Sequence, residues 1–134
     1  MPSVFTKIMT GQLPGRFLYA DELATAFLTI APLRPGHTLV VPREEIDHWQ
    51  DVPAELAAHL FIVAQRIARA MRTAFPSERV GMVIAGLEVP HTHLHVVPID
   101  HLSDLDFHRV QKDPDSAALD AAAERIRAAL TALD

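Results

Sequence analysis

The chain has no cysteine and no long apolar run, and each absence excludes a class of protein. Without cysteine among its 134 residues, it can form no disulfide framework and no thiolate zinc cluster, and it has no cysteine nucleophile. No apolar run approaches the roughly 20 residues of a membrane span, and the first residues lack the apolar stretch of a secretory signal. We therefore expect a cytoplasmic protein with no membrane partner.

Positive charge is also in short supply. Twelve Lys and Arg residues oppose 17 Asp and Glu residues, which gives a formal net charge of −5 at pH 7. Because affinity for a nucleic-acid backbone comes from cations that neutralise phosphates, we do not expect nucleic acid to bind, whereas a small nucleotide needs only a local site. The length fits a single domain over residues 1–134.

The predicted elements follow the order helix, three strands, long helix, two strands and helix. The first helix begins behind Ser3, whose side chain suits an N-cap, and the long helix begins after Pro53 and carries one apolar stripe. Short turns between neighbouring strands favour antiparallel pairing, so we expect an α+β domain with about five antiparallel strands. The predicted helices cover residues 4–9, 53–75 and a C-terminal extension at about 113–134, and the predicted strands cover residues 17–20, 25–30, 37–41, 80–85 and 91–97.

The most distinctive feature is the segment from His91 to Val97, in which histidine takes every second position up to residue 95. On a strand, alternate side chains share one face at steps of roughly 6.6 Å, so the three imidazoles would lie in a row. Three interpretations are open: a structural accident, a three-imidazole metal site, and a catalytic or ligand-binding row. Alternate residues of one flat strand diverge around a small ion, whereas zinc sites gather ligands from several elements, so the third interpretation is favoured.

A histidine row suits phosphoryl chemistry. A neutral imidazole nitrogen can attack phosphorus, and a protonated imidazole donates hydrogen bonds to phosphate oxygens, both near neutral pH. His93 is flanked on both sides and is the candidate nucleophile. His91 and His95 can orient it, donate to nonbridging oxygens or protonate a leaving group.

Four segments resemble the pattern of the histidine-triad (HIT) family, in the family's order. The family motif is His-φ-His-φ-His-φ-φ, where φ is apolar, and residues 91–97 match it except at Thr92. The resemblance covers nearly the whole chain and implies the HIT-type α+β fold. The other three segments are Phe5-x-Lys7-Ile8-x-x-Gly11-x-Leu13-Pro14, Ala26-Phe27-Leu28-x-Ile30 and Pro35-Gly36-His37-Thr38-Leu39-Val40-Val41-Pro42.

The resemblance also implies a reaction. The middle histidine, here His93, would attack the α-phosphorus of a nucleotide, and water would hydrolyse the covalent nucleotidyl-histidine. His37 would lie near the histidine row. Four apolar residues would enclose the base and sugar, with an ordinary core position as the alternative for each: Phe5, Ile8, Phe27 and Ile30.

The resemblance further implies a two-fold homodimer whose sheets run together across the interface. Trp49, Phe61 and the apolar stripe of the 53–75 helix agree with this, because they would leave a large apolar face exposed on so small a monomer.

Departures from the family pattern fall in the binding site. Thr29 stands where an acidic residue commonly binds a ribose hydroxyl. The stretch before the triad is short, with Leu87 and Glu88 at the places of the Gln and hydroxyl residue that contact phosphate. A carboxylate 4 Å from a phosphate costs about 1–4 kcal/mol, so Glu88 is expected to point away, to pair, or to select against dianionic substrates. The candidate nucleotide-binding residues are Phe5, Ile8, Phe27, Thr29, Ile30, His37, Gly86, Leu87, Glu88 and Val89.

Three functions remain to be distinguished. The first is a nucleotide hydrolase or transferase that attacks the α-phosphate of a purine nucleotide derivative, such as a nucleoside phosphoramidate or a dinucleoside polyphosphate. The bound nucleotide would be a purine nucleotide such as AMP or GMP. The second is a nucleotide-binding regulatory module with little turnover, and the third is a metal-binding protein that uses the three histidines. No cofactor is required for imidazole attack, although Mg²⁺ could accompany a polyphosphate. No structural zinc is expected, because Thr6 and Met9 stand where cysteines hold zinc in some relatives.

Overall fold

The computed structural model describes all residues, 1–134, and contains one antiparallel sheet of five strands in the order β1-β2-β3-β5-β4. The predicted α+β class, with five strands and three α-helices, is confirmed. None of the helices combines the length and the apolar character needed to cross a bilayer. The strands are β1 (Phe17–Ala20), β2 (Ala24–Leu28), β3 (Thr38–Pro42), β4 (Arg79–Val83) and β5 (Leu94–Ile99); the helices are α1 (Val4–Met9), α2 (Ala54–Ala74) and α3 (Ser116–Leu133).

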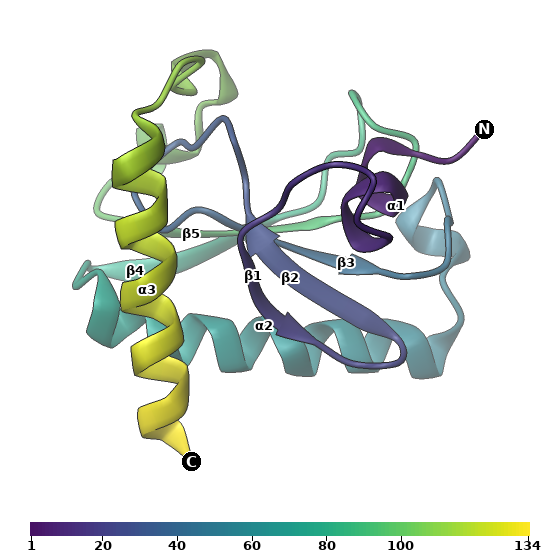
Figure 1. Ribbon diagram of the computed structural model, residues 1–134, viewed down its shortest axis with the longest axis horizontal. Helices are drawn as coiled ribbons and strands as arrows, with labels where there is room; N and C mark the ends of the chain where they lie inside the picture. The colour runs from purple at the N-terminus through teal and green to yellow at the C-terminus, as the bar shows by residue number, and fades with distance from the viewer.

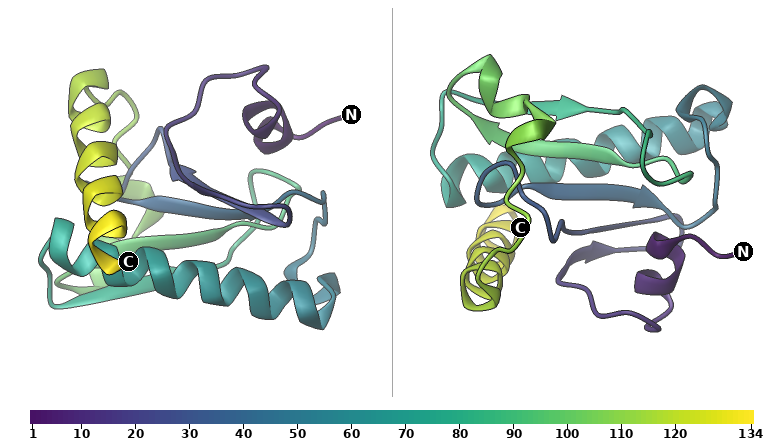
Figure 2. Two further views of the ribbon diagram at one scale, coloured as in Figure 1. Left: turned by 60° about the horizontal axis from the view of Figure 1, so that its bottom comes forward. Right: turned by 90° about the horizontal axis from the view of Figure 1, so that it is seen from above.

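Helices α2 and α3 pack with one face of the sheet, and α1 lies on the other side of the strands (Figure 1). The view from above in Figure 2 shows α1 and the segment between β5 and α3 on the near side of the strands, with α2 behind them. The larger core therefore lies between the sheet and the two long helices, and the opposite face is left for a smaller cluster around α1.

The apolar stripe of α2 is buried, so the expectation that it would stay exposed is wrong. The sheet and α3 pack against it within the larger core. Trp49 and Phe61, which lie outside the stripe, do remain 56% and 51% exposed. The six residues predicted for the stripe are all buried: Leu56, Leu60, Val63, Ile67, Met71 and Ala74.

Side-chain caps fix the starts of two helices. Ser3 is the N-cap of α1, as predicted, and its Oγ accepts a hydrogen bond from the Thr6 amide at 3.1 Å. Helix α3 begins at Ser116, a little later than predicted, because Asp115 serves as its N-cap and accepts from the Ala117 amide.

The predicted strand over residues 91–97 is wrong at both ends. Strand β5 begins at Leu94, because the amide and the hydroxyl of Thr92 both donate to the Ile46 carbonyl at 2.7 Å and so leave the sheet ladder. It continues to Ile99 because β4 pairs with it as far as that residue. The proline at 98 is tolerated because β3 pairs with β5 only as far as Val96, which leaves one side of β5 open there. Of the three histidines in the motif, only His95 lies in a strand.

The register of the sheet brings His95 onto the face that α1 covers. Phe27 of β2 lies opposite Leu39 of β3, which lies opposite His95 of β5. Residues directly opposite each other on antiparallel strands share a face. Val40 and Leu94, which alternate with these residues, point into the larger core. The site is thus built on the sheet face turned away from α2.

Candidate active site

The three histidines of the motif bring their rings together even though only one is in a strand. The ring centroids of His93 and His95 are 4.9 Å apart, and the Phe5 ring of α1 lies 5.7 Å from His91 and 4.8 Å from His93. The Phe107 ring lies 4.8 Å from His95. The rings of His93 and His95 are therefore neighbours, with Phe5 against His91 and His93 and Phe107 against His95.

His91 is fully buried, and the protein uses both of its ring nitrogens. Nε2 lies 2.7 Å from the Pro42 carbonyl, which can only accept, so Nε2 carries the hydrogen. Nδ1 is then an acceptor and takes a hydrogen bond from Ser3 Oγ at 2.6 Å. Both ring nitrogens of His91 are consequently bonded within the protein, and none is left for a ligand.

His93 is held in the opposite tautomer. Its Nδ1 donates to the His91 carbonyl at 2.7 Å, so Nε2 has an unshared electron pair. The residue is only 6% exposed, and its Nε2 has no hydrogen-bond partner in the protein. Thr25 Oγ1 is the only buried side-chain polar atom without a partner, so Nε2 is not fully buried and reaches solvent. Burial lowers the pKa of His93 below its usual value, which keeps this nitrogen unprotonated near neutral pH.

A hydrogen bond from His37 sets the tautomer of His95. The Leu33 amide donates to His37 Nδ1 at 2.9 Å, so His37 carries its hydrogen on Nε2 and donates it to His95 Nδ1 at 2.9 Å. The hydrogen of His95 is then on Nε2, which makes no hydrogen bond within the protein. Burial and neighbouring imidazoles lower the pKa of His37 to about 3 and that of His95 to about 4, so both rings are neutral at pH 7.

The histidine row therefore offers two ring nitrogens that have no partner in the protein and that differ in character. His93 presents a lone pair, and His95 presents an N–H beside it. This combination can attack an electrophilic centre and donate a hydrogen bond to a group attached to it.

A hydroxyl and carboxylate cluster behind His91 was missed by sequence reasoning, which gave Ser3 only the role of a helix cap. Glu45, on the loop after β3, accepts from the Ser3 amide at 2.5 Å and from Thr6 Oγ1 at 2.6 Å. These two bonds fix the residue that donates to His91. Nothing in the sequence pairs Ser3 with His91, which lies 88 positions away.

The smaller apolar cluster forms the wall beside the row, and it contains three of the four residues predicted to enclose a base and sugar. Phe5 and Phe27 are buried in it, with ring centroids 5.8 Å apart, and Ile8 packs against them. Val89 also packs there. Ile30 does not join them: it follows the end of β2 and is 71% exposed.

The residues at which the chain departs from the family pattern lie in different surroundings. Thr29 is half-buried, and its Oγ1 accepts from the Ala31 amide at 3.1 Å. Gly86 has φ +76°, a conformation that favours glycine, and Leu87 is 94% exposed. Glu88 is exposed and forms no ion pair, so it does not pair with an arginine, but its charge acts on His93 and favours the protonated form.

A three-imidazole metal site would need a free nitrogen on each of the three rings. His91 has no free nitrogen, so the row offers at most two ligands. No group of three or more His, Cys, Asp or Glu side chains is arranged to hold a metal ion.

Comparison with known proteins places this geometry in a family. Residues 10–102 match the model of the HIT domain. The chain belongs to the histidine-triad family. It is 36% identical over 126 residues to a HIT-like protein of Mycobacterium tuberculosis, an alignment that covers 88% of each chain. It is 31% identical over 96 residues to the adenosine 5'-monophosphoramidase HNT1 of Saccharomyces cerevisiae, which covers 71% of this chain and 61% of that protein.

A solved histidine-triad structure agrees with the fold over almost the entire chain. A zinc-bound histidine triad family protein from Mycobacterium smegmatis superposes with a TM-score of 0.84 at 36% sequence identity, covering 98% of this chain and 94% of the other. The match includes the segment outside the HIT domain model, in which α3 lies.

Proposed function

We propose that this histidine-triad protein is a nucleotide hydrolase or transferase that acts at the α-phosphate of a purine nucleotide derivative, with His93 as the nucleophile. The observation that carries the proposal is the pair of tautomers: His93 Nε2 has a lone pair with no partner in the protein, and the neighbouring His95 ring presents an Nε2–H. The chain is 31% identical both to a yeast protein named as an adenosine 5'-monophosphoramidase and to an Arabidopsis thaliana protein named as a bis(5'-adenosyl)-triphosphatase/adenylylsulfatase, so these relatives support both substrate classes. We propose a nucleoside phosphoramidate as the first substrate to test.

The proposed reaction has two steps. His93 Nε2 uses its lone pair to form a bond to the α-phosphorus, and the bond from phosphorus to the leaving nitrogen breaks. The leaving nitrogen keeps that electron pair and takes a proton from solvent. The His95 N–H donates a hydrogen bond on the side from which the leaving nitrogen departs. The Nδ1–H of His93, bonded to the His91 carbonyl, stabilises the charge that the ring acquires.

Water completes the cycle. It attacks the phosphorus of the nucleotidyl-histidine, the bond to Nε2 breaks, and the electron pair returns to the ring. The proton lost by water goes back to solvent, so the products are an amine and a nucleoside monophosphate. His91 takes part as a positioning residue, because both of its nitrogens are bonded within the protein.

The wall residues are proposed to bind the nucleoside. Phe5, Ile8 and Phe27 provide an apolar surface beside the row, and Val89 and Gly86 lie on the short loop that approaches His93. Ile30, Leu87 and Glu88 are exposed, so they can contact a nucleotide only at the rim of the cleft.

We propose that the reaction needs no metal, because a neutral imidazole is itself a nucleophile; Mg²⁺ would serve only to accompany a polyphosphate. We also propose that the chain holds no structural zinc ion, because it has no thiolate and no three His, Asp or Glu side chains are grouped to hold one. Measuring the metal content of purified protein tests this, and one zinc ion per chain would contradict it.

A homodimer is proposed through the edge formed by β4 and α2. Strand β4 is an outer strand of the sheet and has no neighbour on one side. Phe61 on α2 and Met82 on β4 line one apolar groove and are 51% and 41% exposed. A second copy paired along β4 would extend the sheet and cover both. Phe61→Glu should therefore give a monomer in analytical ultracentrifugation where the unmodified chain gives a dimer, and a monomeric unmodified chain at micromolar concentration would refute the interface.

The test of function compares His93→Ala with His48→Ala, which changes an exposed histidine outside the row. Adenosine 5'-phosphoramidate should be hydrolysed by the unmodified chain and by His48→Ala, and not by His93→Ala. Tight AMP binding with no hydrolysis by the unmodified chain would favour the regulatory module instead. The exposed Leu87 and the unpaired Glu88, which replace polar contacts to phosphate, are the observations in favour of that module.

A further inference from the structure

Phe107 closes one end of the histidine row. Its ring centroid lies 4.8 Å from that of His95 and 6.3 Å from that of His37, with the rings inclined at 73° and 75°. The side chain is 37% exposed, so it presents an aromatic surface to solvent as well as to His95. Phe5, by contrast, touches the rings of His91 and His93 at the other end.

The segment that carries Phe107 belongs to no strand or α-helix. It joins β5 to α3 through two short 3-10 turns, η2 (Leu102–Leu105) and η3 (Phe107–Arg109). Such a segment needs other contacts to hold an aromatic ring in one place. Its far end is held where the Gln111 amide donates to the Pro32 carbonyl at 2.9 Å.

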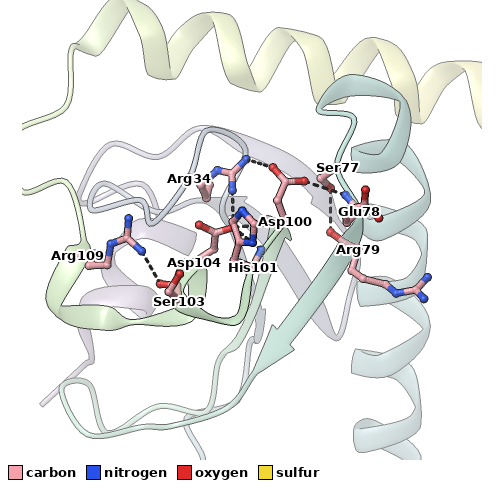
Figure 3. A network of polar contacts seen from close by, with 9 residues as sticks. All are labelled: Arg34, Ser77, Glu78, Arg79, Asp100, His101, Ser103, Asp104 and Arg109. Atoms are coloured by element: carbon pink, nitrogen blue, oxygen red, sulfur yellow. Dashed lines mark hydrogen bonds and ion pairs between the residues drawn. The ribbon is translucent and has the colours of Figure 1, made fainter.

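Arg34 holds the near end of the segment (Figure 3). Its guanidinium donates to Asp104 at 2.6 Å and to Asp100 at 3.0 Å. Asp104 in turn accepts from the amides of Asp100 and His101 at 2.8 and 3.0 Å, which closes the turn that leads to Phe107. The Asp104 side chain is 9% exposed and the Arg34 side chain 31% exposed, so salt screens this ion pair only in part.

The loop that carries Arg34 also sets the chemistry of the site. Leu33, the preceding residue, fixes the tautomer of His37 and through it that of His95. Pro32 anchors the far end of the Phe107 segment. One loop, residues 32–37, therefore positions both the N–H of His95 and the aromatic ring beside it.

We propose that Phe107 is a specificity-determining residue for the leaving group and that Arg34 is the residue that positions it. This inference rests on the proposed function. A group that departs from the α-phosphorus on the side of His95 meets the Phe107 ring, whereas the nucleoside lies against Phe5 at the other end of the row. Leaving amines with an aromatic or apolar surface are thus preferred over small ones, because they bury against Phe107 in the transition state.

Two adenosine phosphoramidates that differ only in their amine test the inference: one releases benzylamine and the other methylamine. The ratio of kcat/KM for the benzylamine to the methylamine compound should fall about three- to tenfold in Phe107→Ala and less in Phe107→Leu, given the usual strength of aromatic contacts. Arg34→Met should lower the ratio in the same direction and add nothing to Phe107→Ala. Leu102→Ala, at an 85% exposed position on the same segment, is the matched control and should leave the ratio unchanged.

AMP separates leaving-group recognition from a general loss of the site. AMP has no leaving amine, so its Kd should stay within about twofold in Phe107→Ala. A ratio that is unchanged in Phe107→Ala while the unmodified chain hydrolyses both compounds would overturn the inference and leave the proposed function standing. Absence of hydrolysis of either compound by the unmodified chain would overturn both.

The placement of Phe107 has a readout that needs no turnover. A ring at 4.8 Å shifts the imidazole proton resonances of His95, so Phe107→Ala should move them. Arg34→Met should move the same resonances, and Leu102→Ala should not. His95 resonances that stay in place in both Phe107→Ala and Arg34→Met would show that the ring does not cover His95, which also overturns the inference.

Discussion

At the scale of single residues, the site depends on which nitrogen of each imidazole carries the hydrogen. Carbonyl groups of Pro42 and His91 and the amide of Leu33 decide this for the whole row, because each can only accept or only donate. The result is a lone pair on His93 next to an N–H on His95. Neither ring needs to be charged for this arrangement to exist.

Ser3 provides the prediction that belongs to this scale. Ser3→Ala removes the hydrogen bond to His91 Nδ1 and the cap of α1 together. Loss of the cap should cost about 0.5–2 kcal/mol of stability, and loss of a hydrogen bond worth about 0.5–1.5 kcal/mol should slow turnover roughly two- to tenfold. Ser3→Thr keeps the hydroxyl and should restore both the melting temperature and kcat; if kcat in Ser3→Ala equals that of the unmodified chain, the Ser3 bond does not position His91.

The sequence could indicate the residues of the row but not their tautomers. Three alternating histidines stand out in a sequence, and His93 could be selected from its central place. Ser3 and Leu33 could not be found in this way, because Ser3 acts across 88 positions and Leu33 acts through a backbone amide that any residue but proline would supply.

At the scale of elements, the periodicity of apolar residues predicted α2 well, whereas the alternation of histidines predicted a strand that begins at residue 91 and not at Leu94. The α2 stripe is buried because a helix of 21 residues repeats its contacts over many turns. Alternation over seven residues is a weaker signal, and here the side chain and the amide of Thr92 bond to Ile46 instead of continuing the ladder. The three rings still lie close together, because His91 and His93 are fixed by their own hydrogen bonds.

The loop before β3 provides the prediction at this scale. Gly36 has φ +95°, and a Cβ at this position would lie 2.7 Å from the Phe75 ring. Gly36→Ala should therefore lower the free energy of unfolding by about 1–3 kcal/mol and disturb His37, the next residue. Gly11→Ala is the matched control, since Gly11 has φ +84° but open space around it. Equal melting temperatures for the two variants would show that the contact with Phe75 is unimportant.

At the scale of the whole molecule, three imidazoles kept neutral by burial make stability depend on pH. The pKa values of His37 and His95 are lowered from 6.5 to about 3 and about 4, and that of His93 is lowered as well. Below pH 6.5 the unfolded chain therefore binds protons that the folded chain does not, and stability must fall as the pH falls.

The measurement is the midpoint of urea unfolding at pH 7 and pH 5, a range in which the carboxylates of lowered pKa stay ionised in the fold. The free energy of unfolding should be about 4 kcal/mol smaller at pH 5, with about 2 kcal/mol from each of His37 and His95. His37→Phe removes one of the titrating rings and should show a smaller difference between the two pH values. Equal midpoints at pH 7 and pH 5 in the unmodified chain would mean that these imidazoles are not kept neutral.

The most direct test of the account is to trap the intermediate. The unmodified chain is mixed with an adenosine phosphoramidate and quenched within milliseconds in alkaline denaturant, and the protein is analysed by mass spectrometry with peptide mapping. One adenylyl group should be found on His93 and none in His93→Ala, because His93 Nε2 is the one imidazole lone pair of the row that has no partner in the protein. Turnover without any adduct on His93, or turnover retained in His93→Ala, would contradict the central claim.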